Sequence, residues 1–231
     1  MKILVTRPEP GASETAAALA ALGHDVIVEP LLHYVPTGTV PQLAGVQALA
    51  ATSAEGVRAF AQIVKRRDLP LFTVGDASAT AARQLQFEDV RSAAGDAVAL
   101  SRLLANLDPS NGAVLHLSGR DLARTISVKG LEIRRSVLYT AEPAAGLSEK
   151  LAAALSADQI DFVLLFSART AQIFARLMRQ SASRPRKLTA LCLSPAVASA
   201  LHGLCPTRIA ERPVQSALMA LIDQEPARRA K

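Results

Sequence analysis

Polar residues and glycines follow several apolar runs of the sequence, where a buried strand would end and a helix or turn would begin. They are Thr6, Arg7, Thr52, Ser53, Gly75, Asp76, Ser118, Gly119, Ser167 and Ser194. In open parallel sheets, ligands bind beyond the carboxyl ends of the strands. Backbone N–H groups at the start of each following helix favour anions there. This pattern predicts a site that holds carboxylates or phosphates without a dedicated basic side chain.

Motifs for several other chemistries are missing from the sequence. There is no GxGxxG after an apolar run, no GxxxxGK[ST] and no GxSxG, so dinucleotide binding, P-loop nucleotide binding and serine hydrolysis lack support. The four histidines are scattered, and Cys192 and Cys205 lack metal-ligand spacing. We therefore expect no metal site built by the protein, and a reactive substrate that mainly needs to be held in position.

The charge balance is basic, at a formal +6. Such a surface can meet nucleic acid or a polyanionic small molecule. The densest clusters are Lys65, Arg66 and Arg67, which we expect to end a helix, and Arg228 and Arg229, which we expect in a polar tail. No recognition helix or aromatic stacking set accompanies them, so we expect no nucleic-acid partner.

The composition predicts a folded chain outside the membrane. Half of the 231 residues are apolar, which provides a sizeable core. The charge-free run 31–54 is broken by prolines, glycines and glutamines, which excludes a membrane span. Because Lys2, Arg7 and Pro8 stand where a signal peptide needs an apolar stretch, we expect a cytoplasmic location.

Short apolar runs alternate with Ala- and Leu-rich segments that have helical patterns. The runs are residues 3–5, 26–28, 46–49, 71–74, 114–117, 162–165 and 191–193. This alternation predicts an α/β fold with parallel sheets covered by helices on both faces.

The sequence also contains an internal repeat. Residues 51–60 parallel residues 165–174, and in both copies apolar residues recur at helical spacing behind a serine suited to the N-cap, Ser53 or Ser167. Residues 74–79 parallel 193–198 in the same order, with Asp76 and Ser194 as the expected caps. We interpret the chain as two copies of one α/β module, whose two lobes enclose a cleft.

Segments along nearly the whole chain resemble the uroporphyrinogen-III synthases, in the family's order. They are ILVTRP at 3–8, LGHDV at 22–26, EPL at 29–31, Thr52 and Ser53, VGDASA at 74–79, LSGR at 117–120, VLY at 137–139, Phe166 and Ser167, and Ser194 and Pro195. The resemblance implies two similar lobes, each a parallel sheet flanked by helices. Lobe one would be residues 1–33 and 143–231 and lobe two residues 41–137, joined by a two-stranded antiparallel linker at 34–40 and 138–142.

The resemblance also implies an activity. The family cyclises hydroxymethylbilane, a linear tetrapyrrole with eight carboxylates, with loss of water and inversion of the last ring, and it needs no cofactor. Tyr139 would be the acid that assists departure of the hydroxyl group. Arg7 would grip a carboxylate, and Ser53, Ser78, Gly119, Ser167 and Ser194 would line the substrate site. We expect a monomer.

One segment departs from the family pattern. Where the family commonly has threonines after Gly-Pro, this chain has Ala196 and Val197 after Ser194 and Pro195. The hydroxyl contacts expected there are missing. A non-catalytic two-lobed module that binds an anionic ligand therefore remains an alternative, and helix capping remains an alternative role for the serines.

Overall fold

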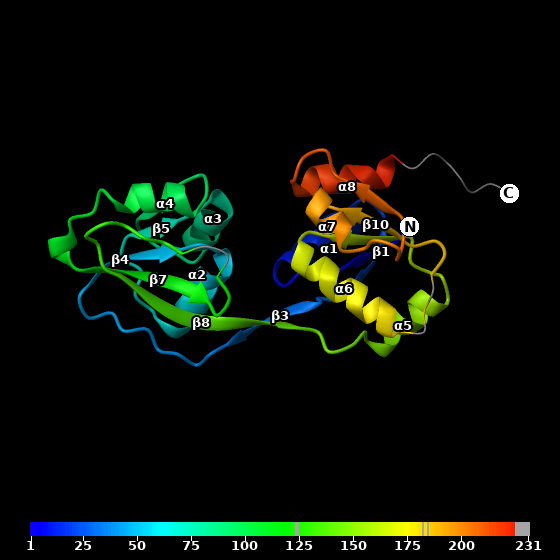
Figure 1. Cartoon of the computed structure of the whole chain (residues 1–231), viewed down its shortest axis with the longest axis horizontal. Coiled ribbons are helices and arrows are strands. Elements are labelled where there is room, and N and C mark those ends of the chain that lie inside the picture. The colour runs from blue at the N-terminus through cyan, green and yellow to red at the C-terminus, as the bar shows by residue number, and fades with distance from the viewer. Residues whose placement is uncertain (123–124, 182, 184, 225–231) are drawn as a thin grey trace. The chain divides into compact units, whose positions relative to one another are not determined.

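The computed structural model describes residues 1–122, 125–181, 183 and 185–224. The chain divides into two compact units, Met1–His33 with Glu142–Lys231 and Tyr34–Ala141 (Figure 1). The first is called unit 1 and the second unit 2. Arg228 and Arg229, expected in a polar tail, lie outside the described residues.

Unit 1 is built on a five-stranded parallel sheet in the order β11-β10-β9-β1-β2. The strands are β1 (Lys2–Val5), β2 (Asp25–Val28), β9 (Phe162–Leu165), β10 (Thr189–Cys192) and β11 (Thr207–Ile209). The helices are α1 (Gly11–Ala21), α5 (Glu149–Ser156), α6 (Ala168–Gln180), α7 (Pro195–Ser199) and α8 (Gln215–Asp223). Ile3 and Val5 pack with Leu19 and Leu218 in one core, while the alternate residue Leu4 is equally buried. Both faces of the sheet are therefore covered.

Unit 2 is built on a six-stranded sheet in the order β3-β8-β7-β4-β5-β6, in which β4 to β8 are parallel. The strands are β3 (Leu32–Pro36), β4 (Val46–Ala51), β5 (Leu71–Thr73), β6 (Val90–Ser92), β7 (Ala113–Gly119) and β8 (Ile133–Pro143). The helices are α2 (Ala54–Ile63), α3 (Asp76–Gln84) and α4 (Ala97–Leu104), with a 3-10 turn at Pro109–Asn111.

The two faces of this sheet have separate cores. Phe60 of α2 and Ala82 of α3 pack on one face, against residues such as Leu49. Leu100 of α4 packs on the other face, with Ala48. The expected α/β class with parallel sheets flanked by helices is confirmed.

The expected strands are present, and the structure adds β6, β11 and most of β8. β6 and β11 are three-residue edge strands with exposed or half-buried residues, so they lack an apolar run. β8 begins with the sequence IRRS, whose two arginines obscure the strand pattern.

The repeat is confirmed at the helix starts. Ser53 and Ser167 have nearly the same backbone angles, φ −150° and ψ 152° against φ −145° and ψ 150°. Each side chain accepts a hydrogen bond at 3.1 Å, from the N–H of Gly56 or of Thr170. Both serines are N-caps of the helix that follows.

The expected caps in the second repeated pair need correction. Gly75, not Asp76, occupies the N-cap of α3, and the Asp76 carboxylate instead accepts a hydrogen bond from the Ser92 hydroxyl at 2.8 Å. Ser194 is the N-cap residue of α7 with Pro195 at the first helical position, but its side chain makes no capping hydrogen bond. At both helix starts the N-cap residue has an extended backbone, and no side chain of that residue makes a capping hydrogen bond.

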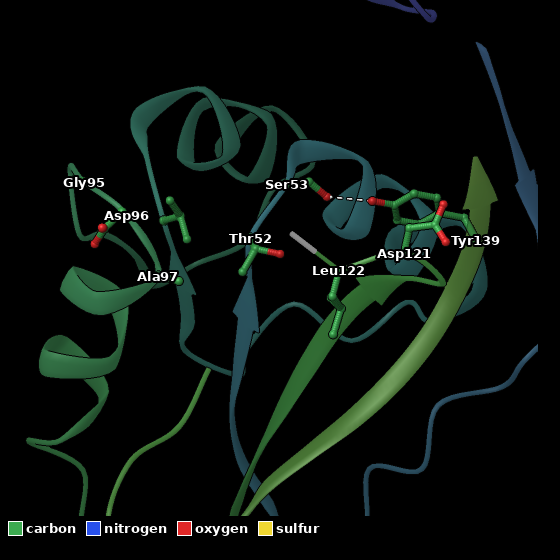
Figure 2. A pocket seen from close by; sticks show the side chains of 10 residues that line it. Thr52, Ser53, Gly95, Asp96, Ala97, Asp121, Leu122 and Tyr139 are labelled. Carbon is green, nitrogen blue, oxygen red and sulfur yellow. Dashed lines mark hydrogen bonds between the residues drawn. The ribbon is translucent and has the colours of Figure 1, made fainter. Parts of the chain in front are cut away.

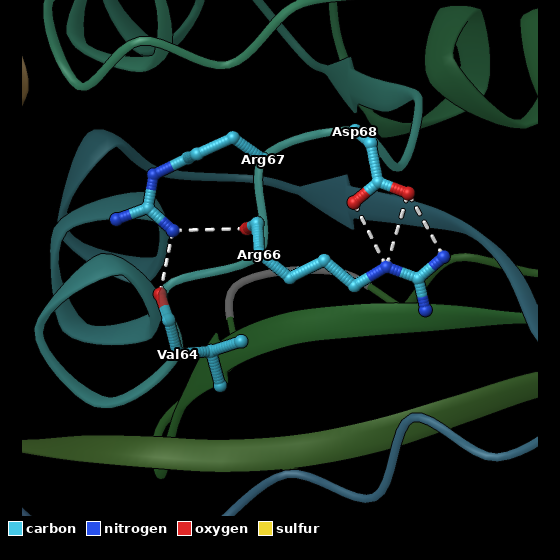
Figure 3. Close-up of polar contacts among 4 residues, drawn as sticks. All are labelled: Val64, Arg66, Arg67 and Asp68. Atoms are coloured by element: carbon cyan, nitrogen blue, oxygen red, sulfur yellow. Dashed lines mark hydrogen bonds and ion pairs between the residues drawn. The ribbon is translucent and has the colours of Figure 1, made fainter.

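The basic residues that follow α2 bind carbonyl groups at the end of the helix, as predicted. Arg67 donates hydrogen bonds to the carbonyls of Ala61, Val64 and Leu85. Figure 3 shows the bond to Val64 and the ion pair of Arg66 with Asp68, at 2.9 Å. These guanidinium groups are occupied by groups of their own unit. The cluster is thus explained by local structure.

Candidate functional site

A cavity of about 350 Å³ opens in unit 2 at the carboxyl ends of its strands. It lies where β4, β5 and β7 end and α2 and α4 begin, and β8 contributes one side. Its lining residues are Thr52, Ser53, Val74, Gly95, Asp96, Ala97, Gly119, Asp121, Leu122 and Tyr139. Three residues predicted for the site, Ser53, Gly119 and Tyr139, therefore meet at one cavity.

The hydroxyl groups of Ser53 and Tyr139 are in hydrogen-bond contact. Ser53 Oγ lies 3.0 Å from Tyr139 Oη (Figure 2). The same Ser53 oxygen accepts a hydrogen bond from the Gly56 N–H. The Tyr139 side chain is thereby connected to the first turn of α2. The arrangement fixes the phenol oxygen at the cavity.

A bulge between β7 and β8 decides which side chain stands beside Gly119. Ser118 pairs with Val137, whereas Gly119 pairs with Tyr139, so one extra residue of β8, Leu138, is accommodated there. Leu138 is fully buried in the core. Bulges commonly re-aim side chains next to functional sites, and this one brings Tyr139 rather than Leu138 opposite the glycine.

The Tyr139 ring is closely packed on two sides. A Cβ atom at Gly119 would lie 2.7 Å from Cε2 and Cζ of the ring, so only glycine leaves enough space. The Tyr34 ring meets the Tyr139 ring edge-on, with centroids 5.2 Å apart and an interplanar angle of 78°.

The surroundings of Tyr139 keep its phenol protonated at neutral pH. Burial raises the pKa of Tyr139 above its ordinary value, and the carboxylates of Glu55 and Asp121 raise it further. The hydrogen bond to Ser53 acts in the opposite direction and lowers the pKa. The group therefore holds a proton and can offer it as a hydrogen-bond donor.

The corner after β7 is held by Arg135 of β8. Its guanidinium donates to Ser118 Oγ at 3.0 Å, to the Gly119 carbonyl at 2.7 Å and to the Arg120 carbonyl at 2.6 Å. The Arg120 N–H donates back to the Tyr139 carbonyl at 2.8 Å. These bonds fix the corner that carries Gly119 and Asp121 to the cavity.

A neutral histidine lies directly behind the cavity. His116 of β7 is only 2% exposed, and its Nε2 lies 3.3 Å from Oγ1 of the cavity residue Thr52. Burial, with a smaller contribution from the Arg135 charge, lowers the pKa of His116 to about 4. His116 is therefore uncharged at neutral pH and contributes no cation to the site.

The other predicted residue of unit 2 lies apart from the cavity lining. Ser78 is buried in the first turn of α3, where its N–H donates to the Gly75 carbonyl. Its place in the helix explains its burial. A role for Ser78 in substrate binding stays a prediction.

Three predicted residues belong to unit 1, at the carboxyl ends of its strands. The Arg7 guanidinium follows β1, stacks 4.4 Å from the centroid of Phe166 and donates to Gln215 Oε1 at 2.8 Å. Ser167 caps α6 after β9, and Ser194 starts α7 after β10. Within unit 1, Arg7, Ser167 and Ser194 therefore share one edge of the sheet, as predicted.

Among residues 1–122, 125–181, 183 and 185–224, no group of three or more His, Cys, Asp or Glu side chains is arranged to hold a metal ion. No helix in the same ranges has the length and apolar character needed to cross a membrane.

Comparison with known proteins assigns the family. The family model described as uroporphyrinogen-III synthase HemD matches residues 13–220, which is most of the chain. The chain belongs to the uroporphyrinogen-III synthase family. Among curated proteins, no sequence matches it at a significant level.

Solved structures show the same fold. The chain is similar to the crystal structure of uroporphyrinogen-III synthetase from Helicobacter pylori, with a TM-score of 0.64 and 15% identity over 96% of this chain and 97% of that one. It is also similar to a mutant uroporphyrinogen III synthase from Thermus thermophilus, with a TM-score of 0.53 and 17% identity over 96% and 98% of the two chains.

Sequence reasoning missed several residues that line or support this cavity. Asp96, Asp121 and Leu122 line the cavity. The Glu55 carboxylate raises the pKa of Tyr139. Arg135 donates a hydrogen bond to the Gly119 carbonyl at the end of β7. Asp121 and Leu122 could have been predicted as site residues, because they directly follow Ser118–Gly119–Arg120 at the carboxyl end of β7. Arg135 had no sequence signal, because its role depends on the pairing of β7 with β8.

Proposed function

We propose that this protein is a uroporphyrinogen-III synthase that cyclises hydroxymethylbilane with loss of water and inversion of the last pyrrole ring. Family membership supports an enzyme of tetrapyrrole biosynthesis. The observation that carries the proposal is the Tyr139 hydroxyl, in hydrogen-bond contact with Ser53 at a cavity whose other polar groups come from strand ends and helix starts.

Tyr139 is the group that assists departure of the substrate hydroxyl. The C–O bond of the terminal hydroxymethyl group breaks with both electrons on oxygen, and that oxygen takes the phenol proton and leaves as water. The positive charge spreads over the adjacent pyrrole ring. When the last ring has attacked and closed the macrocycle, the proton that it loses returns to Tyr139, so the enzyme is restored.

The enzyme mainly imposes geometry on a substrate that closes unaided to the uninverted isomer. The helix starts provide neutral N–H donors for its carboxylates. In unit 2 the start of α2 borders the cavity, and in unit 1 the starts of α6 and α7 carry Ser167 and Ser194. Arg7 is the proposed two-pronged donor to a further carboxylate.

The finer description of the enzyme is also part of the proposal. It is a cofactor-independent hydro-lyase and a cytoplasmic monomer, and its two compact units are the two lobes. An antiparallel pair of segments joins the lobes. The hydrogen bonds from Thr37 N–H to the Leu138 carbonyl and from Ala144 N–H to the Leu31 carbonyl support this, because their partners run in opposite order.

A coupled assay tests the proposed activity. Freshly made hydroxymethylbilane is given to the protein, and the uroporphyrinogen isomers are separated by chromatography. Type III product is expected. If only the type I isomer forms, as in the blank, the enzyme proposal is wrong and the non-catalytic module is favoured, in agreement with the missing hydroxyls at Ala196 and Val197.

A further inference from the structure

Ser53 has more than a capping role, because its single hydroxyl connects a helix start to the Tyr139 phenol. Its oxygen already accepts the Gly56 N–H at 3.1 Å, and it lies 3.0 Å from Tyr139 Oη. A serine hydroxyl can accept two hydrogen bonds and donate one. Once Tyr139 donates its own proton into the cavity, the hydrogen bond between the two hydroxyls must be donated by Ser53.

We propose that Ser53 is a positioning residue that donates its hydroxyl proton to Tyr139 Oη, so that the phenol proton points at the substrate. This inference rests on the proposed function and assigns Ser53 to the catalytic step rather than to carboxylate binding. The hydrogen bonds run in one direction, from Gly56 N–H to Ser53 Oγ, from Ser53 O–H to Tyr139 Oη, and from Tyr139 O–H to the departing hydroxyl.

The chain of hydrogen bonds also matches the charge that appears on Tyr139. As the phenol proton moves to the departing hydroxyl, negative charge develops on Tyr139 Oη. A hydrogen bond to a charged oxygen is stronger than a neutral one. Ser53 provides that bond from the N-cap of α2, where the helix dipole also favours negative charge. Ser53 thus opposes burial and the carboxylates of Glu55 and Asp121, which disfavour the phenolate.

Three substitutions separate this role from capping. Ser53→Thr keeps both the cap and the donor. Ser53→Asp keeps an oxygen that caps the helix, since aspartate and serine are similarly good N-caps, but it has no proton to donate. Ser53→Ala loses both. Ser148→Ala is the matched control, because Ser148 caps α5 through the Leu151 N–H in unit 1.

The kinetic result follows from the loss of one hydrogen bond to a developing charge. We expect kcat of Ser53→Asp and Ser53→Ala to fall roughly 10- to 100-fold, with KM changed little. Ser53→Thr and Ser148→Ala are expected to stay within about threefold of the parent in kcat. Ser148→Ala is expected to lower the melting temperature about as much as Ser53→Ala does, because both lose one cap.

A second measurement does not depend on turnover. The chain has two tyrosines and no tryptophan, so in a Tyr34→Phe background the ultraviolet absorbance of phenolate reports Tyr139 alone. We expect the pKa of Tyr139 to rise in Ser53→Ala, to rise further in Ser53→Asp because of the added negative charge, and to stay unchanged in Ser53→Thr.

The outcomes distinguish the two proposals. If Ser53→Asp keeps the parent kcat, or if kcat falls while the pKa of Tyr139 does not move in Ser53→Ala, the positioning role of Ser53 is overturned. If the unsubstituted protein makes no type III isomer, the proposed function is wrong, and the titration still decides whether Ser53 donates to Tyr139.

Discussion

The Cα of Gly119 and the ring of Tyr139 are in such close contact that no side chain fits between them. A methyl group at position 119 would lie 2.7 Å from two ring carbons and 3.0 Å from the hydroxyl oxygen. Real Cβ contacts are almost never so short, and the neighbour here is the proposed catalytic group. The glycine therefore determines where the phenol stands.

Gly119→Ala is expected to displace the Tyr139 ring and to reduce kcat on the order of 100-fold, because small misplacements of a catalytic group are that costly. The measurement is type III isomer formation together with a circular dichroism melt. Gly146→Ala is the control, since nothing lies within 4 Å of its Cβ position. Full activity in Gly119→Ala would show that the contact is irrelevant to turnover.

Tyr139→Phe removes only the hydroxyl and keeps the ring in its place. We expect the fold to be retained and kcat to fall about 100-fold or more, the usual contribution of a general acid, so that spontaneously formed type I isomer dominates the product. Tyr34→Phe controls for the loss of a hydroxyl elsewhere while preserving the edge-on ring contact. Near-parental turnover in Tyr139→Phe would remove the residue from this role.

Asp121→Asn tests the negative charge beside the phenol. Because the Asp121 carboxylate raises the pKa of Tyr139, its neutral isostere is expected to lower that pKa, as seen by absorbance titration in the Tyr34→Phe background. Asp68→Asn is the control, since Asp68 is exposed and pairs with Arg66. An unchanged titration in Asp121→Asn would mean that this carboxylate does not act on Tyr139.

His116 makes stability depend on pH in the acid range. Its pKa is lowered from 6.5 to about 4 in the folded chain, so below pH 6.5 the unfolded chain binds the proton more readily. Stability is therefore fully present above about pH 6.5 and is lost as the pH falls towards 4, by roughly 2 to 4 kcal/mol.

Urea denaturation at several pH values checks this dependence. His116→Gln is expected to flatten the curve between pH 4 and 6.5, whereas His202→Gln, at an exposed position, leaves it unchanged. If the parent and His116→Gln curves are parallel across this range, the histidine is not the titrating group.

Arg66 and Arg67 are neighbours in sequence with different environments. Arg67 donates hydrogen bonds to carbonyl groups at the end of α2, and its guanidinium lies 4.8 Å from the centroid of the Phe87 ring. Arg66 instead forms an exposed ion pair with Asp68 (Figure 3). Arg67→Ala is expected to lower the free energy of unfolding by about 2 kcal/mol, because partly buried carbonyl groups lose their donor. Arg66→Ala is expected to change it far less, because an exposed ion pair contributes little to stability. Equal effects in thermal melts would contradict this assignment.

The sequence by itself determined the α/β class, the repeated helix starts and the sheet edge at which the candidate site residues lie. Each depends on local signals: apolar runs of strand length, helical spacing, and a serine that can cap the helix following its own strand. Because parallel strands all carry their carboxyl ends to one edge, Ser53 and Gly119 could be assigned to the same edge without coordinates.

Only the tertiary structure decided how the side chains meet. The pairing between β7 and β8 produces the bulge that brings Tyr139 opposite Gly119. The same pairing places Arg135 so that it donates to the Gly119 carbonyl, and it places the phenol where Glu55 and Asp121 raise its pKa. Those strands are joined through 13 intervening residues, 120–132, and neither strand's own sequence encodes their register. Register is set by packing and hydrogen bonding across the sheet, so no local pattern could reveal it.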